Sequence, residues 1–130
     1  MNIPNLNPLI KTVVVTIPQN TAESNGIDTE GLILVGITLH GEEWSGGAYI
    51  SLKASHDGIT YAPVGFYIST TQKANVLELD QFSTQTPPYA VTLNPQLTAG
   101  MQYLKVWSAV DAADVTQTAA RTLTLTLRRP

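Results

Sequence analysis

The sequence predicts an all-β protein that folds as a two-sheet β-sandwich of about eight strands. Three observations support this prediction. Apolar and polar residues alternate with period two in several short runs. These runs are rich in β-branched and aromatic residues and are bounded by Gly, Pro, Asn and Asp. Spacing typical of an amphipathic helix is nearly absent, and many short strands divided by turn residues are typical of a sandwich.

The first half of the chain contains four predicted strands. Residues 11–17 form a β-branched run that ends at Pro18, and residues 32–39 form an apolar run. Residues 48–55 alternate and lead into His56-Asp57-Gly58, after which a strand at residues 60–66 begins. An Asp-Gly pair between alternating runs predicts a hairpin in which Gly58 takes a positive φ.

The second half contains four more predicted strands, at residues 76–79, 89–93, 103–110 and 118–128. In the last of these, leucines at 123, 125 and 127 alternate with threonines at 122, 124 and 126. One face of this strand is therefore expected in the core, and the other in water or against a partner. The polar, proline-bearing stretches at residues 18–28, 82–88 and 94–100 are expected to be connecting loops.

Length and composition favour one domain at residues 11–130, preceded by an extended arm at residues 1–10. At 130 residues and 14.0 kDa, the fold should expose roughly 6,700 Å² of the roughly 20,000 Å² of the extended chain. A core is therefore possible without disulfides. The arm carries two prolines and three asparagines, which favour an extended conformation.

Charge and composition limit the kinds of partner that we expect for this protein. Only 13% of the residues are charged, about half the usual share, while 17 are threonine. This favours a surface that partners cover in part. A net charge of −3 with seven basic residues argues against nucleic acid. The lack of cysteine favours a reducing compartment, and no signal peptide or membrane-spanning segment is predicted, so we expect synthesis in a cytoplasm.

Candidate chemical groups are few, and we expect neither an enzyme nor a cofactor nor a metal. His40 and His56 lie in different turns, and Ser45 lacks the flanking pattern of a hydrolase nucleophile. The acidic pairs Glu42 with Glu43 and Asp111 with Asp114 are best explained as solvated turns. Calcium at the second pair stays a minor alternative, because loop carboxylates suit hard cations.

The residues chosen as partner contacts are apolar residues of the arm and two tryptophans. For each tryptophan, packing in the core or at an edge is the favoured alternative. Alternation places Trp107 on the face of Tyr103 and Lys105. The six candidates are Ile3, Leu6, Leu9, Ile10, Trp44 and Trp107.

Several motifs together resemble small structural proteins of tailed bacteriophages. They are LILVGIT at residues 32–38, Trp-Ser-Gly at 44–46, ASHDGITY at 54–61, YLKVWS at 103–108 and ARTLTL at 120–125. The resemblance covers residues 11–129 and implies a jelly-roll-like sandwich that acts as a capsid decoration or cement protein. The turn at residues 54–61 also resembles a hairpin of discoidin-type and galactose-binding modules.

The favoured function is thus a non-enzymatic virion component that binds the major capsid protein or other virion subunits and stabilises the head shell by bridging neighbours. A homo-oligomer, dimer or trimer, is expected, with no nucleic acid and no membrane as partner. The alternative is a carbohydrate-binding or host-attachment module of a tail fibre, which needs exposed aromatic rings beside convergent polar groups in a cleft. A small hydrolase is the weakest possibility.

Overall fold

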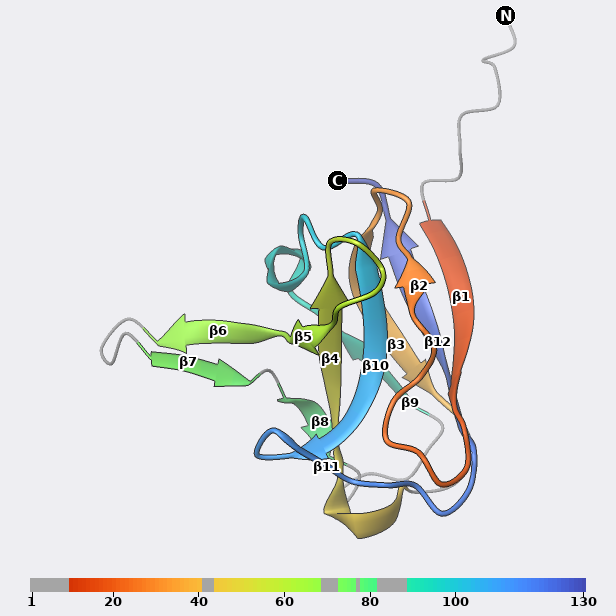
Figure 1. The fold of residues 1–130 in the computed structure, drawn as a ribbon. Coiled ribbons are helices and arrows are strands. Elements are labelled where there is room, and N and C mark those ends of the chain that lie inside the picture. Colours follow the sequence, from red (N-terminus) through yellow and green to blue (C-terminus); the bar gives the residue numbers. More distant parts are fainter. Residues whose placement is uncertain (1–9, 41–43, 69–72, 77, 82–88) are drawn as a thin grey trace, which may run out of the picture.

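The fold is a two-sheet antiparallel β-sandwich, as predicted. A computed structural model describes residues 10–40, 44–68, 73–76, 78–81 and 89–130. The first sheet has the order β1 (Ile10–Ile17), β12 (Arg121–Arg128), β3 (Ile33–Leu39) and β9 (Tyr89–Thr92). Its first two strands pair over eight residues without a break, so the two ends of the described chain are held together (Figure 1).

Two long strands form the centre of the second sheet, β10 (Tyr103–Val110) and β4 (Tyr49–Ser55). Short segments pair with their outer edges. On β10 these are β2 (Ile27–Asp28) and β11 (Ala113–Asp114), and on β4 they are β5 (Ala62–Pro63) and β8 (Glu78–Gln81). Two 3₁₀ turns complete the described elements, η1 (Ser45–Gly47) and η2 (Pro95–Leu97).

The core lies between the two sheets and is made of the alternate residues of the long strands. Leu123, Leu125 and Leu127 of β12 are buried, and the threonines between them are not. The predicted alternation is therefore confirmed. The fully buried aliphatic residues of the neighbouring strand β3 and of the facing strands β4 and β10 include Ile37, Leu39, Ile50, Leu52 and Leu104.

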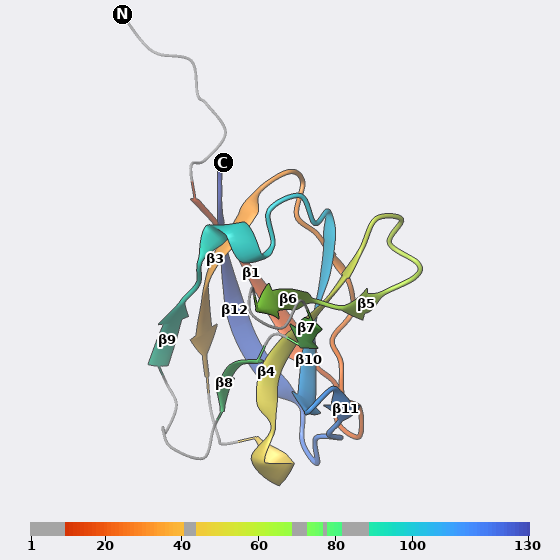
Figure 2. The same cartoon turned by 90° about the vertical axis from the view of Figure 1, so that its left-hand side faces the viewer.

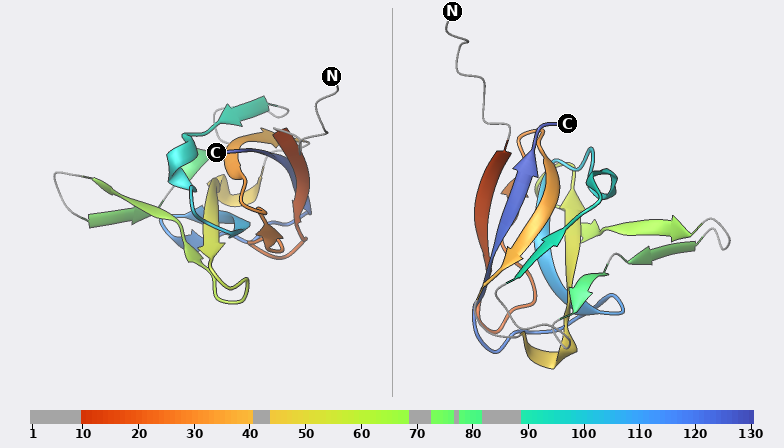
Figure 3. Two further views of the ribbon diagram at one scale, coloured as in Figure 1. Left: turned by 90° about the horizontal axis from the view of Figure 1, so that it is seen from above. Right: turned by 180° about the vertical axis from the view of Figure 1, so that it is seen from behind.

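A two-stranded ribbon stands off from the sandwich. It consists of β6 (Gly65–Ile68) and β7 (Lys73–Val76), which pair with each other and with no other described strand. The chain leaves the second sheet after β5, runs out along the ribbon and returns at β8. The ribbon extends away from both sheets in Figure 1 and in both views of Figure 3, and it points towards the viewer in Figure 2.

Candidate binding surface

The outer face of the second sheet carries a cluster of charged and aromatic side chains. Lys53 and Lys105 lie directly opposite each other on β4 and β10. Glu23 bridges them, with its carboxylate oxygens 2.7 Å from Lys53 Nζ and 3.0 Å from Lys105 Nζ. The hydrogen bond from Lys53 and then that from Lys105 lower the pKa of Glu23, although partial burial opposes them. One carboxylate thus relieves the repulsion between two ammonium groups.

Each lysine of this cluster also lies over an aromatic ring. Lys53 Nζ is 4.7 Å from the centre of the Trp107 ring, and Lys105 Nζ is 4.5 Å from that of Tyr61. Both distances are within the range of a cation–π interaction. Trp107, Lys53, Glu23, Lys105 and Tyr61 therefore form a continuous row of contacts, which we call the lysine row.

A hollow of about 420 Å³ opens at the Tyr61 end of the lysine row. Three segments that are distant in sequence form it: the chain before β2, the turn after β4 and the start of β10. Its residues are Asn25, Gly26, Asp28, Gly58, Ile59, Tyr61, Tyr103 and Lys105. Two phenol rings, an amide, a carboxylate and an ammonium group thus surround one space.

A tightly hydrogen-bonded turn forms one wall of this hollow. Asp57 Oδ1 accepts from the hydroxyl of Ser55 and from the backbone N–H groups of Ile59 and Thr60 at 2.8–2.9 Å. The N–H of Thr60, then that of Ile59, and then the Ser55 hydroxyl lower the pKa of Asp57 to about 2. Gly58 has φ +76°, as predicted from the Asp-Gly pair. The wall is preorganised because these groups are satisfied within the turn.

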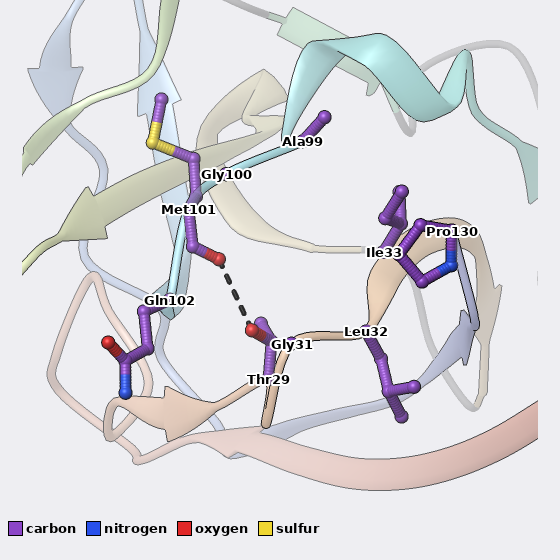
Figure 4. A pocket seen from close by; sticks show the side chains of 9 residues that line it. All are labelled: Thr29, Gly31, Leu32, Ile33, Ala99, Gly100, Met101, Gln102 and Pro130. Carbon is purple, nitrogen blue, oxygen red and sulfur yellow. Dashed lines mark hydrogen bonds between the residues drawn. The ribbon is translucent and has the colours of Figure 1, made fainter.

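A second hollow, of about 500 Å³, lies at the end of the sandwich where the chain terminates at Pro130 (Figure 4). Its wall is mostly aliphatic side chains and backbone. The hydroxyl of Thr29 donates to the carbonyl oxygen of Met101 at 3.2 Å. Because that donor is already used, this space offers less polar recognition than the hollow beside the lysine row.

Three of the six predicted partner contacts, Ile10, Trp44 and Trp107, lie among the described residues. Ile3, Leu6 and Leu9 lie outside the described residues. Ile10 begins β1 with 62% of its surface exposed, so it belongs to the sandwich as well as to the predicted arm.

Both tryptophans pack within the chain itself. Trp44 is 5% exposed and joins the main core. Trp107 is 2% exposed, packs with Ala22 and Ala109, and donates from Nε1 to Asp114 Oδ1 at 2.7 Å. Alternation correctly predicts the face of Trp107, but residues 22–24 pair along β10 beside it and help to cover the indole. The packing alternative therefore describes both residues, and neither offers a surface to a partner in this structure.

The other candidate groups have local roles in the described structure. His40 Nε2 lies 2.8 Å from Thr124 Oγ1, and His56 is exposed in the turn after β4. Ser45 Oγ accepts from Arg121 at 3.1 Å. Asp114 holds Trp107, as described above, and the pair Glu42 and Glu43 falls among residues that the structure does not describe. Within the described ranges, no three His, Cys, Asp or Glu side chains gather as a metal site would require.

Comparisons with known proteins give one solved structure with a similar fold. No protein-family model matches the chain, and no curated protein matches it. The crystal structure of the SPBc2 prophage-derived protein YomS is similar with a TM-score of 0.50. The match covers 95% of this chain and 97% of that one, with 10% of residues identical. At this identity the likeness shows a shared fold along nearly the whole chain.

Sequence reasoning missed the lysine row. Lys53 and Lys105 are visible as charges on two predicted strands, but their direct opposition depends on the register between strands distant in sequence. Two like charges directly opposite each other need a counter-charge. Glu23 lies in a stretch predicted only as a polar loop, so nothing in the sequence assigned it that role.

Proposed function

We propose that this chain is a non-enzymatic structural protein of a bacteriophage virion that binds the head shell and stabilises it by bridging neighbouring subunits, as a capsid decoration protein does. The fold that it shares with a prophage-derived protein supports a phage origin. The motifs resembling phage structural proteins and the low content of charged residues support it further.

The observation that carries this proposal is the ribbon of β6 and β7. Its strands pair only with each other among the described residues and extend away from the sandwich (Figures 1 and 3). An isolated two-stranded ribbon is marginally stable in water, so a neighbouring surface would stabilise it. A sandwich with such a ribbon can sit on one subunit and reach a second one.

Three lysines of the described strands form ion pairs within the chain, which fits a protein partner better than nucleic acid. Lys11, Lys53 and Lys105 are all ion-paired within the chain, with Glu30 or Glu23, so they are poorly available to neutralise phosphates. No helix in the described ranges is long and apolar enough to cross a membrane. The partners that we propose are the major capsid protein and other virion subunits, with synthesis in the host cytoplasm.

The proposal is tested by shortening the ribbon. A variant in which a Gly-Gly turn replaces residues 66–75 should keep the sandwich, because the ribbon is separate from both sheets. Co-sedimentation with empty head shells of the encoding virus should show binding by the full chain and at least tenfold weaker binding by the variant. Thr92→Lys, an exposed change on β9 outside the ribbon, is the control and should bind as the full chain does. Absence of the chain from purified virions would overturn the proposal.

The hollow at the end of the lysine row favours one second candidate function, carbohydrate binding. Aromatic rings beside convergent polar groups are what a sugar site needs, and Tyr61, Tyr103, Asn25 and Asp28 line this space. A glycan array probed with the full chain and with Asp28→Ala distinguishes the two functions. Glycan binding that the variant loses, without binding to shells, would favour attachment to a host surface.

A further inference from the structure

The outer edge of β1 is a long strand edge whose backbone pairs with no segment of the described chain. β1 pairs with β12 across all eight residues. On its other side, no described segment exchanges a backbone hydrogen bond with residues 10–17. A row of unpaired backbone N–H and C=O groups is a template for adding another strand.

The other edges of the two main sheets are short or irregular, which disfavours pairing with another chain, whereas β1 is long and regular. β2, β5 and β11 have two residues each, β9 has four, and the pairing of β8 is interrupted by an irregularity. β1 has eight residues in unbroken register and no proline. Its one charged residue, Lys11, is opposite the buried Leu127 and is held 3.1 Å from Glu30.

The exposed side of β1 is also unusually apolar. Val14 is 67% exposed and Ile10 is 62% exposed, and they account for two of the three exposed large hydrophobic residues among the described positions. Thr12 and Thr16 flank Val14 on the same face. Both the backbone groups and the exposed apolar side chains of this edge are therefore available for contact with another chain.

We propose that β1 pairs antiparallel with β1 of a second copy of this chain, which joins two four-stranded sheets into one of eight strands. The proposal goes beyond the shell-binding function, because it requires no shell. An antiparallel edge is complementary to itself about a two-fold axis, so one surface serves both copies. A strand from an unrelated partner would have no such guaranteed match.

The alternation of side chains restricts the register of this pair. Directly opposed residues share a face of the sheet, so a shift by one residue would turn Val14 inwards. A two-fold axis at Val14 places the two exposed valines opposite each other and pairs Thr12 with Thr16 of the other copy. Lys11 then lies opposite Ile17, and the two lysines are roughly 20 Å apart along the strands. At that distance their repulsion is screened.

The small size of the contact predicts a weak dimer. A stable interface usually uses about 20 to 30 residues on each side, while β1 supplies eight. Dimers should therefore appear only at high protein concentration in solution. Copies held side by side on a particle would have a high effective concentration and would pair more completely.

Sedimentation velocity of the full chain from roughly 10 µM to 1 mM tests the dimer, because eight-residue contacts are expected to be weak. We expect a concentration-dependent shift from monomer to dimer. Val14→Lys should reduce the association constant at least tenfold, because it places two ammonium groups opposite each other. Thr92→Lys adds the same charge to β9, the other edge of this sheet, and should dimerise normally. A monomer at all concentrations, or equal loss in both variants, would overturn the proposal.

Cysteine cross-linking tests the register, since the chain has no native cysteine. Opposed residues have Cα atoms about 4.5 to 5.5 Å apart, which a disulfide can span. Val14→Cys should therefore give a covalent dimer on mild oxidation, seen by electrophoresis without reductant. Thr12→Cys alone should not, because its two copies would be about 14 Å apart, whereas a mixture of Thr12→Cys and Thr16→Cys should. Efficient cross-linking by Thr12→Cys alone would contradict the register. Shell binding by Val14→Lys is measured separately, so that a failure of the dimer can be told apart from a failure of the proposed function.

Discussion

Asp57 shows at the scale of one residue how a turn is made rigid. Its Oδ1 accepts three hydrogen bonds, while the Ser55 hydroxyl oxygen accepts from the N–H groups of Asp57 and Gly58 at 3.2 and 2.9 Å. Two side chains therefore satisfy the four amides of residues 57–60. The sequence predicts the Asp-Gly turn, but the role of Ser55 depends on the folded geometry.

Asp57 should make the stability of the protein depend on pH in a definite window. Its pKa is lowered from 3.8 to about 2, so the ionised form is favoured in the folded state. Its stabilising effect is present above pH 4 and is lost as the pH falls towards 2. Asp57→Asn should lower the thermal midpoint at pH 7, and the difference from the parent chain should shrink steadily as the pH falls from 4 towards 2. If the difference in thermal midpoint stayed the same from pH 7 to pH 2, the stabilising role assigned to the Asp57 carboxylate would be contradicted.

Gly58 should be more sensitive to substitution than a glycine with open space around it. Gly58 and Gly31 have similar angles, with φ +76° and +80°. A Cβ at Gly58 would lie 3.3 Å from Tyr103 Cε1, while one at Gly31 would meet nothing within 4 Å. Gly31→Ala should cost about 1 kcal/mol in free energy of unfolding from strain alone, and Gly58→Ala should cost more. Urea unfolding of the two variants measures both losses of free energy. Equal losses would contradict this prediction.

At the scale of elements, the long strands were predictable and the short ones were not. Residues 11–17, 32–39, 48–55, 89–93, 103–110 and 118–128 match observed strands to within a few residues at each end, because alternation over several residues specifies a half-buried strand. β2 and β11 have two residues each. Alternation cannot be recognised over that length, and only pairing with β10 defines them.

The turn between β10 and β11 gives a prediction about an element that the sequence did not reveal. Val110 pairs with Ala113, and the two residues between them have positive φ, 49° for Asp111 and 64° for Ala112. Such a turn favours glycine at its second position. Ala112→Gly should therefore raise the free energy of unfolding by about 1 kcal/mol. A lower value in chemical unfolding would show that the strain is absent.

The lysine row gives a prediction about how one segment is attached to the second sheet. Glu23→Gln would leave Lys53 and Lys105 opposite each other without a counter-charge. We expect a loss of about 1 kcal/mol in free energy of unfolding at low salt, which shrinks in 1 M salt because charge interactions are screened. Glu30→Gln breaks the one ion pair with Lys11 and should cost less. If Glu23→Gln lost the same free energy of unfolding at low salt and in 1 M salt, the electrostatic explanation would be contradicted.

At the scale of the whole molecule, the sequence predicts the sandwich better than it predicts the surfaces. Residues 54–61 and 103–108 carry motifs noticed in the sequence, and the structure brings parts of both to the hollow beside Tyr61 and Tyr103. Their meeting depends on the pairing of β4 with β10. Register between distant strands determines which outward side chains become neighbours, and composition does not reveal it.

The segment before β1 is expected to act in attachment rather than in folding. Pro4 and Pro8 lack backbone donors and favour extended neighbours. Removing residues 1–9 leaves all eight residue pairs between β1 and β12 in place, because the first of them joins Ile10 to Arg128. The truncated chain should therefore unfold at nearly the same temperature as the full chain.

The same truncation should weaken association with head shells. Ile3, Leu6 and Leu9 would be lost, and each well-buried aliphatic side chain contributes about 1.5 to 3 kcal/mol before the cost of ordering. Ordering the backbone opposes this by roughly 1 to 2 kcal/mol per residue, so main-chain hydrogen bonds to the partner must add to the apolar contacts. We expect at least about tenfold weaker binding in co-sedimentation, which corresponds to about 1.4 kcal/mol. The triple variant Ile3→Ser, Leu6→Ser, Leu9→Ser keeps the length and should show a similar loss. Truncated protein that binds shells as well as the full chain, or that fails to fold, would contradict the role of this segment.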